Sequence, residues 1–525
     1  GDPAINNWCG PLIFPFPPPQ RPHLFTMDQV LPAPVFSAIG RAIEAVYSLK
    51  PLVEPTCFLV PAFARTAVQG LADSIGFDVE TLNMTLGLFL AYPLGMVMQA
   101  MPYGRVRHVF SFLLGAFLLQ FIVGVQWIHH VASSLAAYAM LAVLPRRASK
   151  NAVPVFAMLY MTAGHLHRQF INYLGWDMDF TGSQMVLTIK LYSLAYNLYD
   201  GEHLAAGGTD RASSRCKHLA LDKLPGLIEY LGYTFCFANI IAGPAYEYKY
   251  YADACDGSLL YDKAGKPKGK IPSNVWPTVA PLLQSVVHLG VFVAIGGMFP
   301  VLDPDDPQRN TPAFLSEKIL AYPLVLRMGY CWLGLFFSRQ KYYFAWKNAE
   351  GSNNLWYAGF EGFDDKGEPK GWDIASNIDV LKFETAPNLK VLTGAWNKKT
   401  SNWLGRYVYT RTGGSLVATY GLSAFWHGFY PGYYMFFLTV PLITACERMG
   451  RKKISPRFGT SSLAYRAACM LVTTVVVSYS IMPFQMLAFE WSLAVLKNHY
   501  FFGHVVCILF YAAVSQMKTP KKKEA

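Results

Sequence analysis

The sequence predicts an all-α integral membrane protein, and three observations carry that prediction. Hydrophobic residues make up 53% of the 525 residues and charged residues only 15%, whereas soluble domains are about 25% charged. Aromatic residues, also at 15%, are typical of interfacial belts. Uncharged stretches recur, each at or above the ~20 residues with which a helix crosses hydrocarbon. They occupy residues 81–104, 109–145, 273–302, 412–446, 467–489 and 498–517.

The expected elements follow in chain order. Residues 1–60 form a proline-rich N-terminal extension with a first helix expected at 35–49, residues 61–517 form the membrane domain, and residues 518–525 form a basic tail. The polar segment 348–399 carries too many charges to span, so short interfacial or re-entrant helices are expected there. Membrane spans are predicted near 83–102, 107–126, 132–146, 152–167, 183–200, 224–245, 275–300, 318–345, 414–428, 432–448, 463–487 and 499–517.

The positive charge of the chain points to the membrane rather than to nucleic acid. A net charge of +12 in a soluble protein would suggest nucleic acid. Here lysine and arginine gather in short loops, as the positive-inside tendency predicts, which places those loops in the cytosol. The loops include residues 146–147, 451–453 and 521–523.

The C-terminal residues resemble a localisation signal. Lys522 and Lys523 stand at the fourth and third positions from the end, and this placement resembles the di-lysine retrieval signal of endoplasmic reticulum membrane proteins. A solvated basic tail is the alternative. Both interpretations place the C-terminus in the cytosol.

Neither a metal site nor a cofactor site is predicted. The nine cysteines show no paired spacing and no metal motif. His129 and His130 are adjacent, so on a helix their side chains point about 100° apart. They also mark the place where the long stretch 109–145 is expected to divide into two spans. No cluster of histidine, aspartate and glutamate is suited to a metal.

His427 is the most informative residue of the chain. It lies inside the uncharged stretch 412–446, where a polar, ionisable group costs free energy unless it is paired or lines a cavity. Gly428, Pro431 and Gly432 follow it, so a helix is expected to end just after His427 and a new one to begin. Imidazole is the usual side chain for moving protons near neutral pH. A structural hydrogen-bonding histidine is the alternative.

Asn397 is the second candidate. It follows Trp396 and precedes a helix expected at 400–409, which Thr400 or Ser401 would cap. A turn or capping role for Asn397 is the alternative to an amide that holds an acyl carbonyl or positions a reacting hydroxyl. Nearby Asn402 competes for the same assignment.

Together these residues resemble a known family. Trp396-Asn397, Thr400 and Trp403, followed by Trp426-His427-Gly428, are similar to the signature of the membrane-bound O-acyltransferases (MBOAT). The resemblance covers roughly residues 60–525 and rests on an ordered set of motifs, which is most similar to the lysophosphatidylcholine acyltransferase-like branch. The further motifs are Tyr199-Asp200-Gly201, Gly243-Pro244, Gly359-Phe360, Gly362-Phe363, Trp372-Asp373, Phe383-Glu384-Thr385 and Phe429-Tyr430-Pro431-Gly432-Tyr433.

The resemblance implies a fold and an activity. The fold is a bundle of about eleven transmembrane helices, with re-entrant or interfacial helices around a central reaction chamber. The activity is transfer of a fatty acyl group from acyl-CoA, entering from the cytosol, to the sn-2 hydroxyl of a lysophospholipid, entering from the bilayer. Lysophosphatidylcholine is the leading acceptor, with lysophosphatidylethanolamine and others beside it. No cofactor is implied beyond the co-substrate acyl-CoA, and a homo-oligomer remains open.

The family's catalytic histidine and asparagine fall on His427 and Asn397. A buried imidazole stays neutral and can accept the hydroxyl proton, and an amide can stabilise the oxyanion of the tetrahedral intermediate. Direct transfer is preferred over an acyl-enzyme on Ser423, one helical turn before His427. The remaining candidates are Lys398, Lys399 and Arg406 for the CoA phosphates, and Trp396, Trp403, Phe425, Trp426 and Tyr430 for the acyl tunnel. Ordinary helix packing and interfacial charge are their alternatives.

Two other functions compete with this hypothesis. Another branch of the same family would act on sterols, diacylglycerol or proteins, and the ordered Gly-Phe, Trp-Asp and Glu-Thr motifs argue against it. A transporter would use His427 as a proton relay. The scarcity of charged residues in the other spans and the lack of visible inverted repeats argue against a transporter.

Overall fold

The computed structural model describes residues 54–76, 78–175, 178–302, 311–458 and 462–520. Within these ranges all elements are helices apart from three isolated β-bridges, which confirms the all-α prediction. The first helix predicted at 35–49, the basic residues 521–523 and the di-lysine pair lie outside the described residues.

The chain divides into two compact units. The first unit takes Gly1–Ser285 and Ala345–Ser376, and the second takes Val286–Phe344 and Asn377–Ala525. The long helix α16 (Leu324–Leu355) carries the chain from the second unit back to the first. Each unit is therefore built from two separate stretches of sequence.

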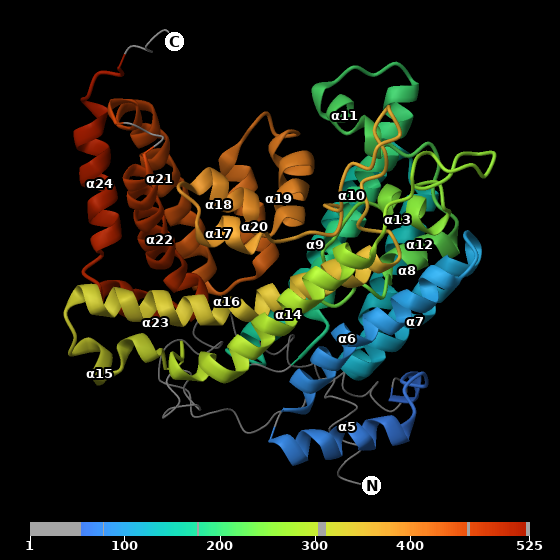
Figure 1. Ribbon diagram of the computed structural model, residues 1–525, viewed down its shortest axis with the longest axis horizontal. Helices are drawn as coiled ribbons and strands as arrows, with labels where there is room; N and C mark the ends of the chain where they lie inside the picture. The colour runs from blue at the N-terminus through green and yellow to red at the C-terminus, as the bar shows by residue number, and fades with distance from the viewer. Residues whose placement is uncertain (1–53, 77, 176–177, 303–310, 459–461, 521–525) are drawn as a thin grey trace, which may run out of the picture. The chain divides into compact units, whose positions relative to one another are not determined.

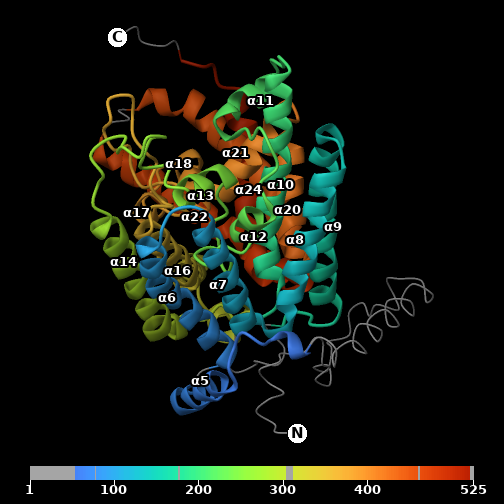
Figure 2. The same cartoon turned by 90° about the vertical axis from the view of Figure 1, so that its right-hand side faces the viewer.

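The first unit is a helical bundle with one continuous apolar core. Buried side chains of α6, α7, α8, α9, α10, α12 and α13 contribute to this core, and α8, α9 and α10 run side by side (Figure 2). Its helices are α5 (Ala62–Ile75), α6 (Val79–Ala100), α7 (Arg105–Val123), α8 (Trp127–Val143), α9 (Arg146–Phe170), α10 (Thr181–Ala205), α11 (Arg211–Arg215), α12 (Leu227–Thr234), α13 (Tyr248–Cys255) and the first half of α14 (Val275–Ile295).

The second unit holds both candidate catalytic residues. Its helices α21, α22 and α24 pack side by side (Figure 1). The second unit also contains the second half of α14 and the first part of α16. Its other helices are α15 (Glu317–Leu320), α17 (Val380–Glu384), α18 (Leu389–Ala395), α19 (Lys398–Leu404), the π-helix η6 (Gly405–Tyr409), α20 (Leu416–His427), α21 (Pro431–Lys453), α22 (Leu463–Met486), α23 (Phe489–Asn498) and α24 (Phe502–Ser515).

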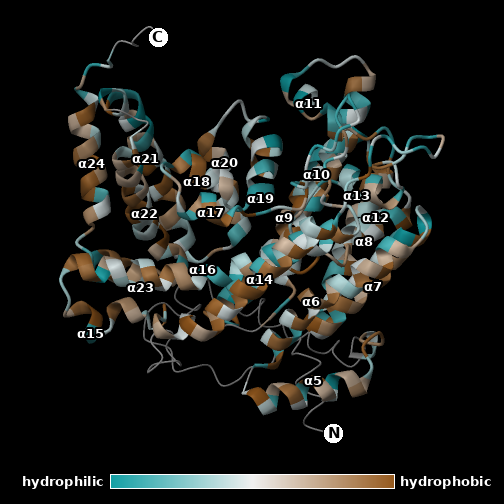
Figure 3. Cartoon of the chain, viewed as in Figure 1, coloured by the Kyte–Doolittle hydropathy of each residue, from teal (hydrophilic) through white to brown (hydrophobic). Residues whose placement is uncertain are grey.

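Several of these helices are long and apolar enough to cross a membrane. In the described ranges there are four, namely Val79–Ala100, Arg105–Val143, Val275–Met298 and Leu463–Met486, and a fifth if the bent pair α23–α24 counts as one span. The predicted total of about eleven is not confirmed. Only 11% of the apolar window of α14 is buried inside the protein, and Figure 3 shows α14 and α24 as largely hydrophobic. Such a surface suits contact with lipid hydrocarbon.

The span predicted at 224–245 is wrong in its length. The helix there, α12, has 8 residues, which is too short to cross a bilayer. Lys190 on α10 is 1% exposed, and its Nζ donates to the carbonyl of Tyr233 at 2.8 Å and to Oδ1 of Asn239 at 2.7 Å. These bonds satisfy polar groups where the helix ends, as non-helical backbone in a membrane protein requires.

The predicted division of 109–145 also lies elsewhere. The α-helix α7 ends at Val123, and a 3-10 turn at Gly124–Gln126 separates it from α8, which begins at Trp127. His129 and His130 therefore lie within α8 rather than at the break. The whole run Arg105–Val143 comprises 39 residues, which at 1.5 Å per residue is well beyond the thickness of the hydrocarbon core.

Candidate active site

His427 is the last residue of a helix, as the sequence predicts. The helix α20 ends at His427, and Gly428 follows with φ 116°, a conformation that side chains rarely adopt. The N–H of Gly428 donates to the carbonyls of Ala424 and Phe425. Pro431 then begins α21, where its missing N–H costs nothing. The backbone thus turns sharply beside the imidazole.

A hydrogen bond orients the imidazole of His427. Its Nδ1 lies 2.7 Å from the carbonyl oxygen of Ser423 on the same helix. A carbonyl only accepts, so Nδ1 carries the proton, and in the neutral ring Nε2 is the acceptor nitrogen. This is the protonation pattern that a general base needs.

Aromatic rings surround the half-buried imidazole. Ring centroids lie 4.8 Å away for Trp426, 5.8 Å for Tyr433, 5.3 Å for Phe437 and 5.2 Å for Phe484. Three helices supply these rings. Trp426 belongs to α20, Tyr433 and Phe437 belong to α21, and Phe484 belongs to α22. These rings limit the movement of the imidazole and reduce the access of water to it.

Gly432 brings α22 close enough for Phe484 to reach His427. A Cβ on Gly432 would lie 2.0 Å from the carbonyl oxygen of Pro483 and 2.9 Å from that of Leu487. The N–H of Gly432 donates to the latter carbonyl at 2.8 Å. The second glycine of the motif therefore permits a close approach of two backbones.

Replacing Gly432 with alanine is expected to destabilise the protein, because backbone atoms must move to admit the methyl group. Overpacking of this kind costs about 1–3 kcal/mol. The check is the thermal midpoint of the protein in detergent. A Cβ on Gly421 of α20 would have no atom within 4 Å, so Gly421→Ala is the matched control and should leave the midpoint equal or raised. Equal midpoints for both variants would contradict the close approach.

Asn397 does not cap its helix with its side chain. It occupies the position before α19 with φ 44° and ψ 51°, and its side chain makes no capping bond. The helix begins at Lys398, so the prediction that it starts at 400 under a cap from Thr400 or Ser401 is wrong. The left-handed conformation is one that asparagine tolerates better than most residues. The side chain instead accepts a hydrogen bond, through Oδ1, from Nδ2 of Asn377.

Asn377 supplies the missing cap, and sequence reasoning did not find it. Its Oδ1 accepts from the N–H of Lys399 at 3.0 Å, and its backbone carbonyl accepts from the N–H of Lys398 at 2.9 Å. Its Nδ2 donates to Oδ1 of Asn397 at 3.1 Å. A residue 22 positions before Lys399 thus satisfies the end of α19, which no local pattern signals.

A partly buried ion pair supports the segment before Asn397. Arg339 on α16 is 8% exposed, and its guanidinium contacts both carboxylate oxygens of Glu384 at 3.0 Å. The hydroxyl of Tyr343 donates to the same carboxylate. Phe383, next to Glu384, packs on Trp396 with a centroid distance of 4.9 Å. The motif around Glu384 is visible in the sequence. No sequence pattern predicted its partners Arg339 and Tyr343 on α16.

The structure brings part of the predicted set together. The helix α20 packs on η6, and Trp403 of α19 lies 6.3 Å from Trp426 between ring centroids. Both indoles are buried, whereas Asn402 is exposed. Ser423 and Tyr430 are buried, Phe425 packs on Phe429, and Lys398, Lys399 and Arg406 are half-buried along α19 and η6. Trp396 instead belongs to the cluster with Phe383, Tyr342 and Tyr343.

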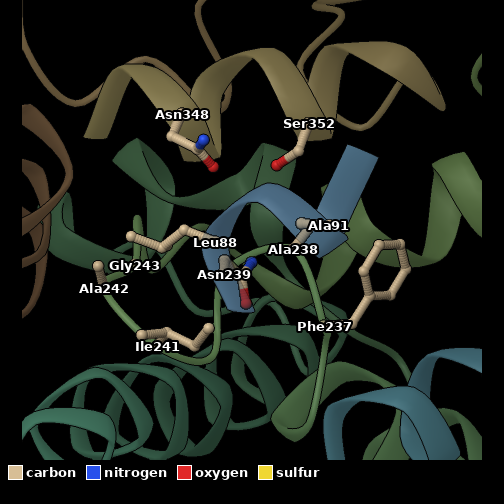
Figure 4. Close-up of a pocket in the computed structure, with 10 residues that line it drawn as sticks. All are labelled: Leu88, Ala91, Phe237, Ala238, Asn239, Ile241, Ala242, Gly243, Asn348 and Ser352. Atoms are coloured by element: carbon tan, nitrogen blue, oxygen red, sulfur yellow. The ribbon is translucent and has the colours of Figure 1, made fainter. Parts of the chain in front are cut away.

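A small cavity in the first unit contains none of the predicted site residues. Figure 4 shows Asn348 and Ser352 of α16 facing the segment around Asn239 and Gly243. The cavity has room for about one water molecule. Among the described residues, no group of three histidine, cysteine or acidic side chains could hold a metal ion.

Comparison with known proteins gives consistent matches. Residues 168–488, which include Asn397 and His427, match the family model described as MBOAT, the membrane-bound O-acyltransferase family. Lysophospholipid acyltransferase 6 of Drosophila melanogaster is 31% identical over 461 residues. The aligned residues are 84% of this chain and 62% of the Drosophila protein, so this chain spans less than two thirds of the length of that protein. Membrane-bound glycerophospholipid O-acyltransferase 2 of Homo sapiens is 30% identical over 476 residues, 87% of this chain and 89% of the human protein. A lysophospholipid acyltransferase of Schizosaccharomyces pombe is 28% identical over 459 residues, 83% and 87% of the two chains.

Proposed function

Because the chain belongs to the membrane-bound O-acyltransferase family, and is therefore a membrane acyltransferase, we propose that it transfers a fatty acyl group from acyl-CoA to the sn-2 hydroxyl of a lysophospholipid. Lysophosphatidylcholine is the first acceptor to test, with lysophosphatidylethanolamine and other lysophospholipids after it. The names of the similar proteins support this class of acceptor. The reaction serves phospholipid remodelling.

One observation supports the chemistry more than any other, namely the hydrogen bond from Nδ1 of His427 to the carbonyl of Ser423. It leaves Nε2 as the basic nitrogen, in a ring that aromatic neighbours hold in place. An alcohol is a poor nucleophile when neutral, so a positioned base is needed for its proton.

The proposed reaction proceeds in two steps. Nε2 of His427 takes the proton of the acceptor hydroxyl while that oxygen attacks the thioester carbonyl. The amide of Asn397 donates to the resulting oxyanion, which stabilises the tetrahedral intermediate. The C–S bond then breaks, and the CoA thiolate leaves with the proton from the imidazolium. Ester and free CoA are the products, and no acyl group is carried by Ser423.

The same proposal assigns residues to the binding of CoA and of the acyl chain, and it assigns the protein to a membrane. Lys398, Lys399 and Arg406 bind the phosphates of CoA at a cytosolic opening. The aromatic side chains of Trp403, Phe425, Trp426 and Tyr430, together with Trp396, contact the acyl chain. The protein resides in the endoplasmic reticulum membrane with its C-terminus in the cytosol, which the basic tail supports.

The test uses purified protein in detergent with oleoyl-CoA and a panel of acceptors. The panel holds lysophospholipids of several headgroups, a sterol and diacylglycerol, and free CoA is followed over a reaction without acceptor. We expect CoA release with lysophospholipids only, and phospholipase A2 should free the transferred oleate from the product, which shows sn-2 placement. Release with the sterol or diacylglycerol but with no lysophospholipid would overturn the proposal.

A further inference from the structure

Asn377 holds the candidate oxyanion donor by its side chain. It is 3% exposed, and both ends of its amide are engaged, Oδ1 with the N–H of Lys399 and Nδ2 with Oδ1 of Asn397. All of these residues lie in the second unit. A buried amide with both ends bonded is well fixed in orientation.

The network determines which way each amide points. A backbone N–H only donates, so the atom of Asn377 that faces Lys399 is the oxygen, and its other end is the NH₂ group. That NH₂ group needs an acceptor, so Asn397 presents its own oxygen to it. The Nδ2 of Asn397 therefore points away from Asn377, and in the described part of the chain it has no hydrogen-bond partner.

We propose that Asn377 is a positioning residue, which turns the Asn397 amide so that its N–H group faces the reacting carbonyl. This role rests on the proposed function. An oxyanion needs a donor, and an Asn397 amide turned by 180° would offer an oxygen, which repels it. Asn397 makes no capping bond with its side chain, and the bond from Nδ2 of Asn377 to its Oδ1 selects which atom of that side chain is offered.

The sharpest test is Asn377→Asp in the full-length protein. The carboxylate still accepts from the N–H of Lys399, which preserves the cap of α19. It offers no donor to Asn397, whose amide then turns to donate to the new carboxylate. We expect kcat to fall on the order of 10- to 100-fold, as for other misplaced catalytic groups, with little change in KM for either substrate.

Asn388 provides a matched control within the same unit. Its side chain caps α18 by accepting from the N–H of Val391 at 2.9 Å, and among the described residues it makes no hydrogen bond to Asn397. Asn388→Asp should retain both its cap and wild-type turnover. Hydrogen exchange of the first α19 amides separates capping from positioning, because protection should persist in Asn377→Asp and fall in Asn377→Ala.

A double-mutant cycle with Asn397→Gly decides the question. If Asn377 acts through Asn397, Asn377→Asp lowers turnover in the wild-type background and has no further effect once the Asn397 amide is gone. Independent, multiplicative losses would overturn the proposal, and so would loss of α19 protection in Asn377→Asp. An inactive wild-type protein would instead overturn the proposed function, so the two failures are distinguishable.

Discussion

Replacing His427 with alanine should lower turnover by about 10²–10⁴-fold, the range that a general base contributes. The hydrogen bond to the Ser423 carbonyl prepares Nε2 as the base, and alanine has no group to take the hydroxyl proton. KM for acyl-CoA should change little, because the loss concerns the transition state. The measurement is CoA release under saturating lysophospholipid and acyl-CoA.

Two further variants make this result specific. His427→Gln keeps much of the volume inside the aromatic surroundings and also lacks a basic nitrogen, so it should be as inactive as the alanine variant. His203→Ala is the histidine control, since His203 pairs with Asp210 at 2.9 Å in a partly exposed contact of small energetic weight. A folded His427→Gln protein with full turnover would remove His427 from the role of base.

Replacing Asn397 with glycine should lower kcat by about 10²–10³-fold, the loss found when one oxyanion donor is removed. Glycine adopts the φ of 44° without strain, so this variant removes the amide and keeps the backbone. Asn397→Asp should lose at least as much activity, because its carboxylate accepts from Asn377 but repels the oxyanion. CoA release and the thermal midpoint together separate lost chemistry from lost stability.

Asn402→Ala is the decisive control for Asn397. Asn402 lies exposed on α19 in the same short segment, and its replacement should leave turnover near wild type. Full activity in Asn397→Gly with loss of activity in Asn402→Ala would transfer the donor role to Asn402. Full activity in both variants would assign Asn397 to the turn alone.

The sequence by itself determined the helical class, the family and the break after His427. The break was predictable because Gly428, Pro431 and Gly432 restrict the local backbone, and local conformation is encoded within a few residues. The apolar stretches were predictable for the same reason, since the length and composition of a span are local properties. The resemblance carried by the ordered motifs agrees with the family match over 168–488.

Only the tertiary structure decided how these pieces meet. Residues 224–245 have the composition of a span, but Lys190 from α10 binds the polar groups where α12 ends. Asn377, rather than Thr400 or Ser401, caps α19 through a bond to the N–H of Lys399, 22 residues away. The ring of Phe484 reaches His427 because Gly432 lets α22 approach. Each of these contacts joins residues distant in sequence, and their free energy depends on packing and on paired donors and acceptors, which no local pattern contains.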